Sequence, residues 1–105
     1  MTGFCIVYIT AGSAEEAETL ARSAVERRLA ACCSIVPNVR SIYRWQGAVE
    51  DDTEHLLIVK TRREQFEDLE RHIRAMHSYE VPELLVLPVI GGDADYLDWL
   101  RDSLG

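Results

Sequence analysis

The sequence lacks the long apolar segment that a membrane-spanning helix requires. Its first apolar run, Phe4–Ile9, is far shorter than the ~20 residues that cross a bilayer, and no basic residue precedes it. Cysteine is also scarce: there are three, and two of them, Cys32 and Cys33, are adjacent, so we expect no disulfide framework. These absences predict a cytoplasmic protein of a reducing compartment that does not enter a membrane.

The sequence has no excess of basic residues either. Lysine and arginine total 11 against 18 aspartate and glutamate residues, which gives a net charge of −7. Such a surface repels nucleic-acid phosphates and anionic lipids, so we expect no nucleic-acid partner. The densest acidic run, residues 50–54, has no EF-hand spacing. It either binds a hard cation such as Mg²⁺ weakly or forms a solvated loop.

Motifs of catalysis and of tight metal binding are missing as well. The chain contains no G-x-S-x-G, no P-loop, no G-x-G-x-x-G, no C-x-x-C and no H-x-x-x-H. We therefore expect a binding protein and not an enzyme. A nucleophilic dyad of Cys32 with His77 is the one catalytic arrangement that the residues leave open, because spatial proximity is invisible in a sequence.

What is present predicts a single globular domain over residues 1–105. The composition is 48% hydrophobic and 28% charged, which is ordinary for a folded domain and argues against disorder. Apolar patterns predict strands at 4–9, 31–45, 49–60 and 84–87. Gln46-Gly47 is a candidate hairpin turn, and Pro37-Asn38 indicates a bulge because proline cannot donate to a central ladder.

Three helices are predicted between and after these strands. Ser13 with Glu16, and Thr61 with Glu64, form capping-box patterns at the starts of the first two, and Asp93 caps a short last one. Arg27 and Arg28 are expected in the last turn of the first helix. Core-facing positions at helical spacing are Ala17, Leu20, Ala21, Ala24 and Val25 in the first helix and Phe66, Leu69, Ile73 and Met76 in the second.

The resulting order, β-α-β-β-α-β-α, predicts an α+β fold of ferredoxin-like architecture. Two β-α-β units would place two helices on one face of an antiparallel four-stranded sheet, with a further helix at the C-terminus. The two central strands form arms of roughly 12 to 14 residues, against a usual ~5–6. A ribbon this long needs a surface to pack on, so we infer a homo-oligomer. The alternative is a shorter, bent hairpin that folds back onto its own sheet.

Several blocks of the sequence resemble the CutA family of divalent-ion tolerance proteins, in the family's order and spacing. The blocks are Arg28-Leu29-Ala30-Ala31-Cys32, Ile35-Val36-Pro37, Ser41–Gly47, Leu57–Thr61, His77–Leu84 and Gly92–Leu100. The resemblance implies a ferredoxin-like protomer in a compact homotrimer whose long hairpins join neighbouring sheets. It also implies a role in tolerance of copper or other divalent metals. The alternative is a regulatory trimer, like the PII signal proteins, that binds a small metabolite or a protein partner in clefts between subunits.

The resemblance also bears on metal ligands. The copper ligands proposed in the family are a cysteine at the end of the first strand and a histidine pair before the loop that contains Tyr79. Here Ile9 and Met76 occupy two of these positions and only His77 matches. His77 is therefore the candidate metal ligand. Its alternative role is that of a structural hydrogen-bonding residue.

The remaining candidates are expected around a cleft. Lys60 and Glu83 stand beside buried strands, so Lys60 is expected to have either an acidic partner, for which Glu54 and Glu83 are the candidates, or a solvent-filled cleft. Such a pair would form either a ligand pocket or a structural network. Cys32 is either a buried small residue or a thiol in the cleft. Tyr43 and Trp45 are either interface aromatics or walls of the cleft.

Overall fold

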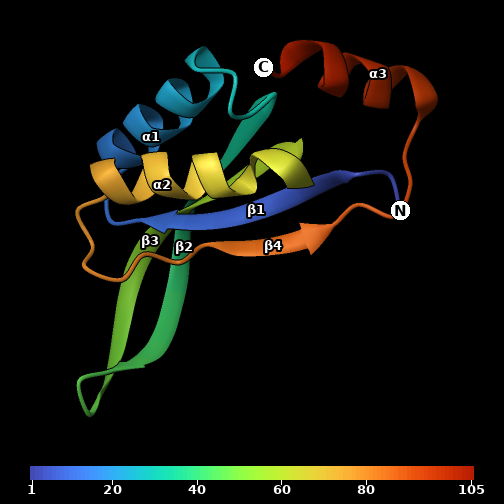
Figure 1. Cartoon of the computed structure of the whole chain (residues 1–105). Coiled ribbons are helices and arrows are strands. Elements are labelled where there is room, and N and C mark those ends of the chain that lie inside the picture. The colour runs from blue at the N-terminus through green and yellow to red at the C-terminus, as the bar shows by residue number, and fades with distance from the viewer.

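Four antiparallel strands and three α-helices make up the computed structural model, which describes residues 1–105 (Figure 1). This confirms the predicted α+β class and the predicted order of elements. The elements are β1 (Phe4–Ala11), α1 (Ala14–Glu26), β2 (Cys32–Trp45), β3 (Ala48–Arg62), the 3-10 helix η1 (Arg63–Gln65), α2 (Phe66–Met76), β4 (Leu85–Pro88) and α3 (Ala94–Ser103).

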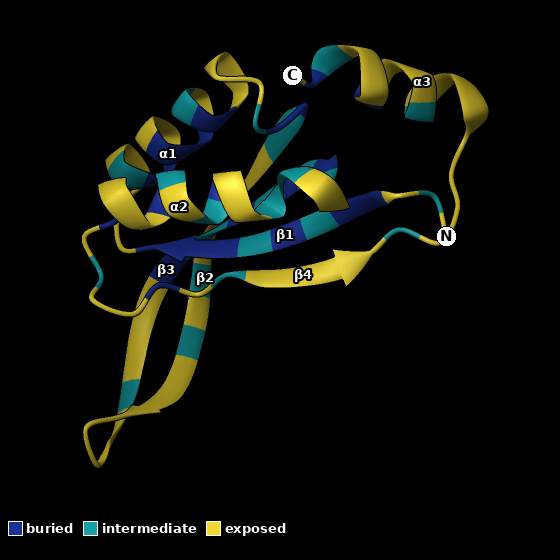
Figure 2. Cartoon of the chain, viewed as in Figure 1, coloured by how far each residue is buried: buried dark blue, intermediate teal, exposed yellow.

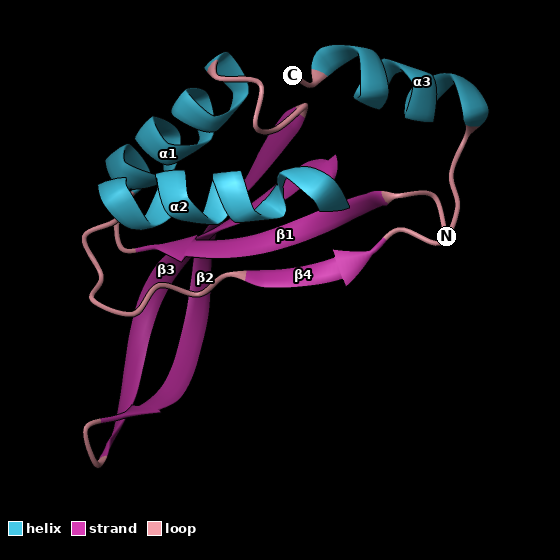
Figure 3. Ribbon diagram, viewed as in Figure 1, coloured by secondary structure: helices cyan, strands magenta, loops and turns pink.

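The sheet has the strand order β2-β3-β1-β4, and every neighbouring pair is antiparallel. Helices α1 and α2 lie on one face of it (Figure 3). Residues directly opposite each other share a face, so Val7, Val59 and Val86 point to the same side. The main core forms between that side and the helices (Figure 2). Its largest side chains include Val7, Ile9, Leu20, Leu57, Val59, Leu69 and Ile73.

Helix α1 begins as predicted and ends earlier than predicted. The hydroxyl of Ser13 accepts a hydrogen bond from the Glu16 amide at 3.1 Å. The helix ends at Glu26, so Arg27 and Arg28 lie beyond its last turn, and Arg28 takes a left-handed φ of 57°. The expectation that Val25 is core-facing is wrong, because Val25 is exposed. Its position falls at the edge of the apolar stripe, where the helix turns away from the sheet.

The predicted capping box before the second helix is wrong. Thr61 belongs to β3, and its hydroxyl donates instead to the Leu29 carbonyl at 2.7 Å. The short helix η1 precedes α2, and neither has a side-chain cap. At the far end of α2, Met76 is exposed and not part of the core stripe. The strong strand pairing of β3 up to Arg62 thus overrides the local helix-start signal.

The β2–β3 hairpin extends beyond the rest of the sheet, as its length predicted (Figure 1). The register shifts between Val36 and Val39, where Asn38 has a φ of 59°, so the bulge at Pro37-Asn38 is confirmed. At the tip, Gln46 and Gly47 have φ values of 51° and 83°, as a two-residue hairpin turn requires. The ribbon is largely exposed on both arms (Figure 2).

The face of the sheet opposite the helices is uncovered. Strand β4 was predicted to be buried, but it is an exposed edge strand with Leu85 58% accessible. Cross-strand register puts Leu85 on one face with Tyr8 and Ile58, and Leu87 with Ile6 and Lys60. This set of residues, which we call the open face, has no helix of its own chain over it. The sequence pattern identified the strand correctly but could not show that one side of it lacks a partner.

Helix α3 packs through a small second cluster at the end of the sheet. Leu100 and Leu104 pack with Phe4 and Ala31. Asp93 caps the helix by accepting a hydrogen bond from the Tyr96 amide at 3.1 Å, as predicted. None of the helices has the length and apolar character needed to cross a membrane.

Candidate functional site

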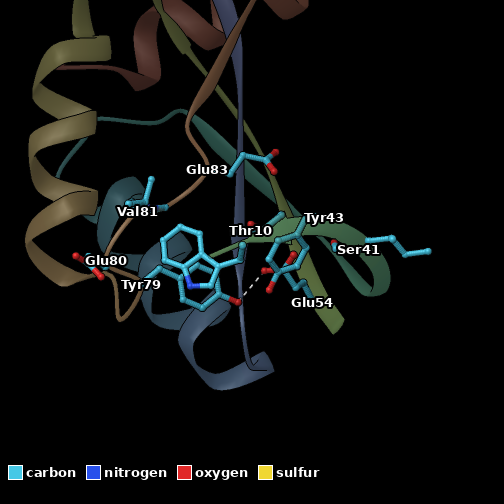
Figure 4. A pocket seen from close by; sticks show the side chains of 11 residues that line it. Thr10, Ser41, Tyr43, Glu54, Tyr79, Glu80, Val81 and Glu83 are labelled. Atoms are coloured by element: carbon cyan, nitrogen blue, oxygen red, sulfur yellow. Dashed lines mark hydrogen bonds between the residues drawn. The ribbon is translucent and has the colours of Figure 1, made fainter. Parts of the chain in front are cut away.

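A cavity of about 690 Å³ opens between the hairpin and the loop that follows α2 (Figure 4). We call it the Glu54 cavity, after the buried carboxylate in its wall. It is lined by Thr10 from the end of β1, by Ser41, Ile42, Tyr43 and Trp45 from β2, by Glu54 from β3, and by the segment Tyr79–Glu83.

Strand geometry explains why these side chains meet. In β3, Glu54 precedes Leu56 and Ile58 at even spacing, so all three point to the open face, away from the helices. On β2, Tyr43 is paired with Glu50, and the alternation places it on the same side as Ser41. The loop after α2 then brings Tyr79 to Glu54 from the other side (Figure 4).

Glu54 is buried, with a relative accessibility of 6% for the whole residue. It accepts one hydrogen bond, from the Tyr79 hydroxyl to Oε2 at 2.7 Å. No basic side chain forms an ion pair with it, and none lines the cavity. A buried carboxylate without a countercharge carries a large desolvation cost. The cavity is therefore a place of negative potential that favours a positively charged group.

Three side chains around the cavity have raised pKa values, chiefly through burial and hydrogen bonding. Partial burial, and then the charge of Glu54, raise the pKa of the Glu83 carboxyl. Burial and the hydrogen bond to Glu54 raise the pKa of Tyr79. A 2.5 Å hydrogen bond to Asp52 raises the pKa of Tyr43 to about 12. Each shift disfavours a further negative charge near the cavity, as expected where no cation offsets the existing one.

His77 is buried and both of its ring nitrogens are engaged. Nε2 lies 2.7 Å from the Thr10 carbonyl, and Nδ1 accepts from the Tyr79 amide at 3.0 Å. Ile9 is buried in the core and Met76 is exposed, so the three positions discussed for copper do not converge on an open site. No group of three or more His, Cys, Asp or Glu side chains that could hold a metal ion forms anywhere in the chain. The geometry of His77 thus corresponds to its structural alternative.

Within the chain Lys60 forms no ion pair, so the acidic partner, one of its two expected environments, is not found at Glu54 or Glu83. Its ammonium donates to the Ser34 hydroxyl at 2.7 Å and lies 3.6 Å from the sulfur of Cys32. Cys32 and Lys60 are cross-strand partners on the open face, away from the cavity. Cys33 points to the opposite side and packs on the main core, where burial raises its pKa to about 12.

The structure therefore brings together Tyr43, Trp45, Glu54 and Glu83, and separates from them Cys32 and Lys60. His77 lies behind the cavity wall, in contact with Tyr79. Sequence reasoning missed Tyr79 as a site residue. Its only signal was an aromatic ring in a short loop beside a histidine, which is too common a pattern to single out.

Glu16 holds this loop in place. Its carboxylate accepts from the Ser78 amide at 2.8 Å, from the Ser78 hydroxyl at 3.1 Å and from the Gly12 amide at 3.4 Å. Burial alone would raise the pKa of Glu16, but the hydrogen bonds from Ser78 and the nearby His77 outweigh it and lower the pKa. The start of α1 is thereby tied to the loop that supplies the cavity wall.

Comparison with known proteins gives a consistent result. A family model described as CutA1 divalent ion tolerance protein matches residues 5–103. The divalent-cation tolerance protein CutA of Thermus thermophilus is 51% identical over 100 residues, which cover 95% of this chain and 97% of that protein. The chloroplastic protein CutA of Arabidopsis thaliana is 47% identical, and the chain spans about half of it, 54%.

Solved structures agree with the sequence matches. The Thermus thermophilus protein superposes with a TM-score of 0.94 at 50% identity, covering 97% of this chain and 99% of that one. CutA1 of Oryza sativa gives a TM-score of 0.95 at 42% identity, covering all of this chain and 98% of that one. The relatives' names refer to tolerance of divalent cations and to no chemical reaction.

The comparisons also correct the expected location. CutA of Archaeoglobus fulgidus, 41% identical with a TM-score of 0.92 over 95% of this chain and 97% of that one, is described as periplasmic, and the Arabidopsis protein is chloroplastic. Few cysteines and a negative charge therefore do not fix a cytoplasmic location, because relatives with the same fold are found in other compartments. From the family match over nearly its whole length and the close likeness to solved relatives, this chain belongs to the CutA family of divalent-ion tolerance proteins.

Proposed function

We propose that the protein serves divalent-cation tolerance by binding a cation in the Glu54 cavity, as a homotrimer of single-domain, ferredoxin-like protomers. The observation that carries the proposal is the buried carboxylate of Glu54, which has one hydrogen-bond donor and no countercharge. A cation in the cavity would offset the cost of burying that charge. The role is one of binding, and no catalytic step is assigned to it.

Copper or another divalent ion is the first candidate ligand. The name of the family supports it, and so do Glu54 and Glu83, whose oxygens line the cavity without a basic residue beside them. With no third ligand side chain converging there, we expect weak binding in which water completes the coordination shell. The second candidate is a small metabolite, which the cavity volume of about 690 Å³ favours.

The homotrimer is supported by the surfaces that one chain leaves uncovered. The open face presents Tyr8, Leu85 and Leu87 beside an edge strand, and the hairpin presents Val49 at 65% accessibility. A second copy that packs on these surfaces would bury them and pair the edge. The number three comes from the resemblance to the family.

Equilibrium dialysis of the reduced protein against copper(II) and zinc(II), each alone, tests the cation site. We expect binding that weakens at least roughly tenfold in Glu54→Gln, because the amide keeps the hydrogen bond from Tyr79 and loses the charge. Glu26→Gln is the matched control, since Glu26 is exposed at the end of α1 and outside the cavity. It should bind as the wild type does.

His77→Ala separates this site from one centred on the histidine. A folded His77→Ala protein should retain most of its affinity, because His77 is occupied by Thr10 and Tyr79. Loss of binding in His77→Ala with no change in Glu54→Gln would place the ion at the histidine and refute the Glu54 site.

A further inference from the structure

We propose that the Glu54 cavity binds a protonated organic amine, whose N–H groups donate to Glu54 and whose carbon groups pack against aromatic rings. The inference rests on the second ligand of the proposed function, the small metabolite, because it names a chemical class for the molecule that the same cavity takes. It is carried by three features of the cavity: an unpaired acceptor, an aromatic lining, and a volume larger than one ion requires.

The unpaired acceptor is Oε1 of Glu54. The Tyr79 hydroxyl occupies Oε2 at 2.7 Å, and no group of the chain donates to Oε1. No buried side-chain oxygen in the structure is left without a partner, so Oε1 is reached from the cavity. Lys60 lies on the same strand and the same face as Glu54, but it cannot donate to Oε1, because the two residues are six positions apart, about 20 Å along the strand. An N–H donor that enters the cavity can form a hydrogen bond with Oε1.

The aromatic lining comes from two different segments. Tyr43 and Trp45 line the cavity from the hairpin, and Tyr79 lines it from the loop after α2, facing Glu54 (Figure 4). The faces of aromatic rings attract cations within about 6 Å, and most strongly where water is excluded. Ile42, Val81 and Pro82 add apolar surface. Carbon substituents of an ammonium gain from these walls, whereas a hydrated metal ion gains nothing from them.

Size and ligand count point the same way. The cavity holds about 690 Å³, within the range of sites for small organic molecules and far larger than one ion requires. Three carboxylates line it, those of Glu54 and of the exposed Glu80 and Glu83, and no set of three metal ligands converges. An organic amine satisfies both the charge and the apolar walls.

The test is an NMR titration of the purified full chain, in its native oligomeric state, with benzylammonium and with neutral benzyl alcohol. The two probes share a ring and differ in one polar group, so the comparison isolates the positive charge. We expect benzylammonium to bind in the millimolar range or tighter, with shifts at Glu54 and Tyr79. Benzyl alcohol should bind at least roughly tenfold more weakly. Equal affinity for the two probes would overturn the inference.

Variants then locate the contacts. Glu54→Gln should lower the affinity for benzylammonium at least roughly tenfold, and Glu26→Gln should leave it unchanged. Tyr79→Phe keeps a ring beside the cavity and should bind nearly as well as the wild type, whereas Tyr79→Leu should bind several-fold more weakly. If the phenylalanine and leucine variants bind alike, the aromatic contact is refuted.

Zinc(II) alone, titrated in parallel, keeps this inference distinct from the proposed function. Binding of zinc at Glu54 with no binding of benzylammonium overturns the amine and leaves the cation site standing. Binding of benzylammonium alone supports the amine and removes the divalent ion as the cavity's ligand. If neither binds, both proposals fail. The comparison of probes uses the wild-type chain, so it holds even where a variant does not fold.

Discussion

Among single residues, Glu16 makes the most side-chain hydrogen bonds. Two of them reach the loop after α2, and the third caps the start of α1. Its carboxylate accepts two hydrogen bonds from Ser78 and one from Gly12. Its Oε2 lies 3.9 Å from Nδ1 of His77. The loop that carries Tyr79 is therefore positioned by a charge on α1 and not by apolar burial. Sequence reasoning used Glu16 only as part of a capping box, because its second partner lies far away in the chain.

We predict that Glu16→Ala lowers the free energy of unfolding by about 1–3 kcal/mol, because the variant leaves the donors of Ser78 without an acceptor. The ionised form is stabilised in the folded state, which lowers the pKa from its ordinary 4.5. This contribution is complete above that value and is lost as the pH falls through the lower, folded-state pKa. In urea denaturation, the difference in free energy of unfolding between the wild type and Glu16→Ala should therefore become smaller as the pH falls below 4.5.

The control for that measurement is Glu15→Ala. Glu15 is exposed one position earlier in the same first turn, and its side chain makes no hydrogen bond. Its loss should cost under about 1 kcal/mol, through the helix dipole alone. If the two alanine variants were equally stable at neutral pH, Glu16 would contribute no more than a helix-start charge.

At the scale of elements, the hairpin is the feature that the sequence predicted best. Its length, the bulge at Pro37-Asn38 and the turn at Gln46-Gly47 all follow from local rules: proline cannot donate, and glycine tolerates positive φ. The failures fall where a distant contact overrides a local signal. Thr61 was predicted to cap a helix, but it bonds to Leu29, which lies 32 residues away in the chain.

The turn gives a test at this scale. Gly47 has a φ of 83°, so Gly47→Ala forces a side chain into a left-handed conformation and should lower the free energy of unfolding by about 1–2 kcal/mol. Gly91→Ala is the matched control, because a Cβ at Gly91 meets nothing within 4 Å and its φ is not positive. Chemical denaturation of both variants measures the difference. Equal stabilities would mean that the tip of the hairpin is not coupled to global unfolding.

For the whole molecule, the open face shows the limit of the sequence-based predictions: the strand could be predicted, but its exposure could not. The continuous apolar run Leu84–Leu87 indicates an apolar strand, and β4 is one, but its exposure depends on what lies against it. The cavity was only half predictable for the same reason. Tyr43 and Trp45 were expected as interface or cleft aromatics, and Glu54 and Glu83 as candidate partners of Lys60. The separation of Lys60 from Glu54 depends on their spacing along β3.

The proposed assembly predicts a native mass of about 36 kDa by sedimentation equilibrium, which is three times the 11.9 kDa of one chain. Leu85→Lys should shift the protein toward smaller species, because it puts a charge on the open face without touching the main core. Glu70→Lys on α2 serves as the control for an added charge away from that face. A wild-type mass of one chain would refute the trimer.

The strand order β2-β3-β1-β4 also has a kinetic consequence. Strands β2 and β3 are joined by two residues and can form within microseconds, whereas Cys5 pairs with Pro88 at the far end of the chain. Closing that long loop costs more entropy than closing the turn, so β4 should dock after the hairpin has formed. During that interval the edge of β1 is unpaired, and the folding chain is then most exposed to pairing with another molecule before its own sheet is complete.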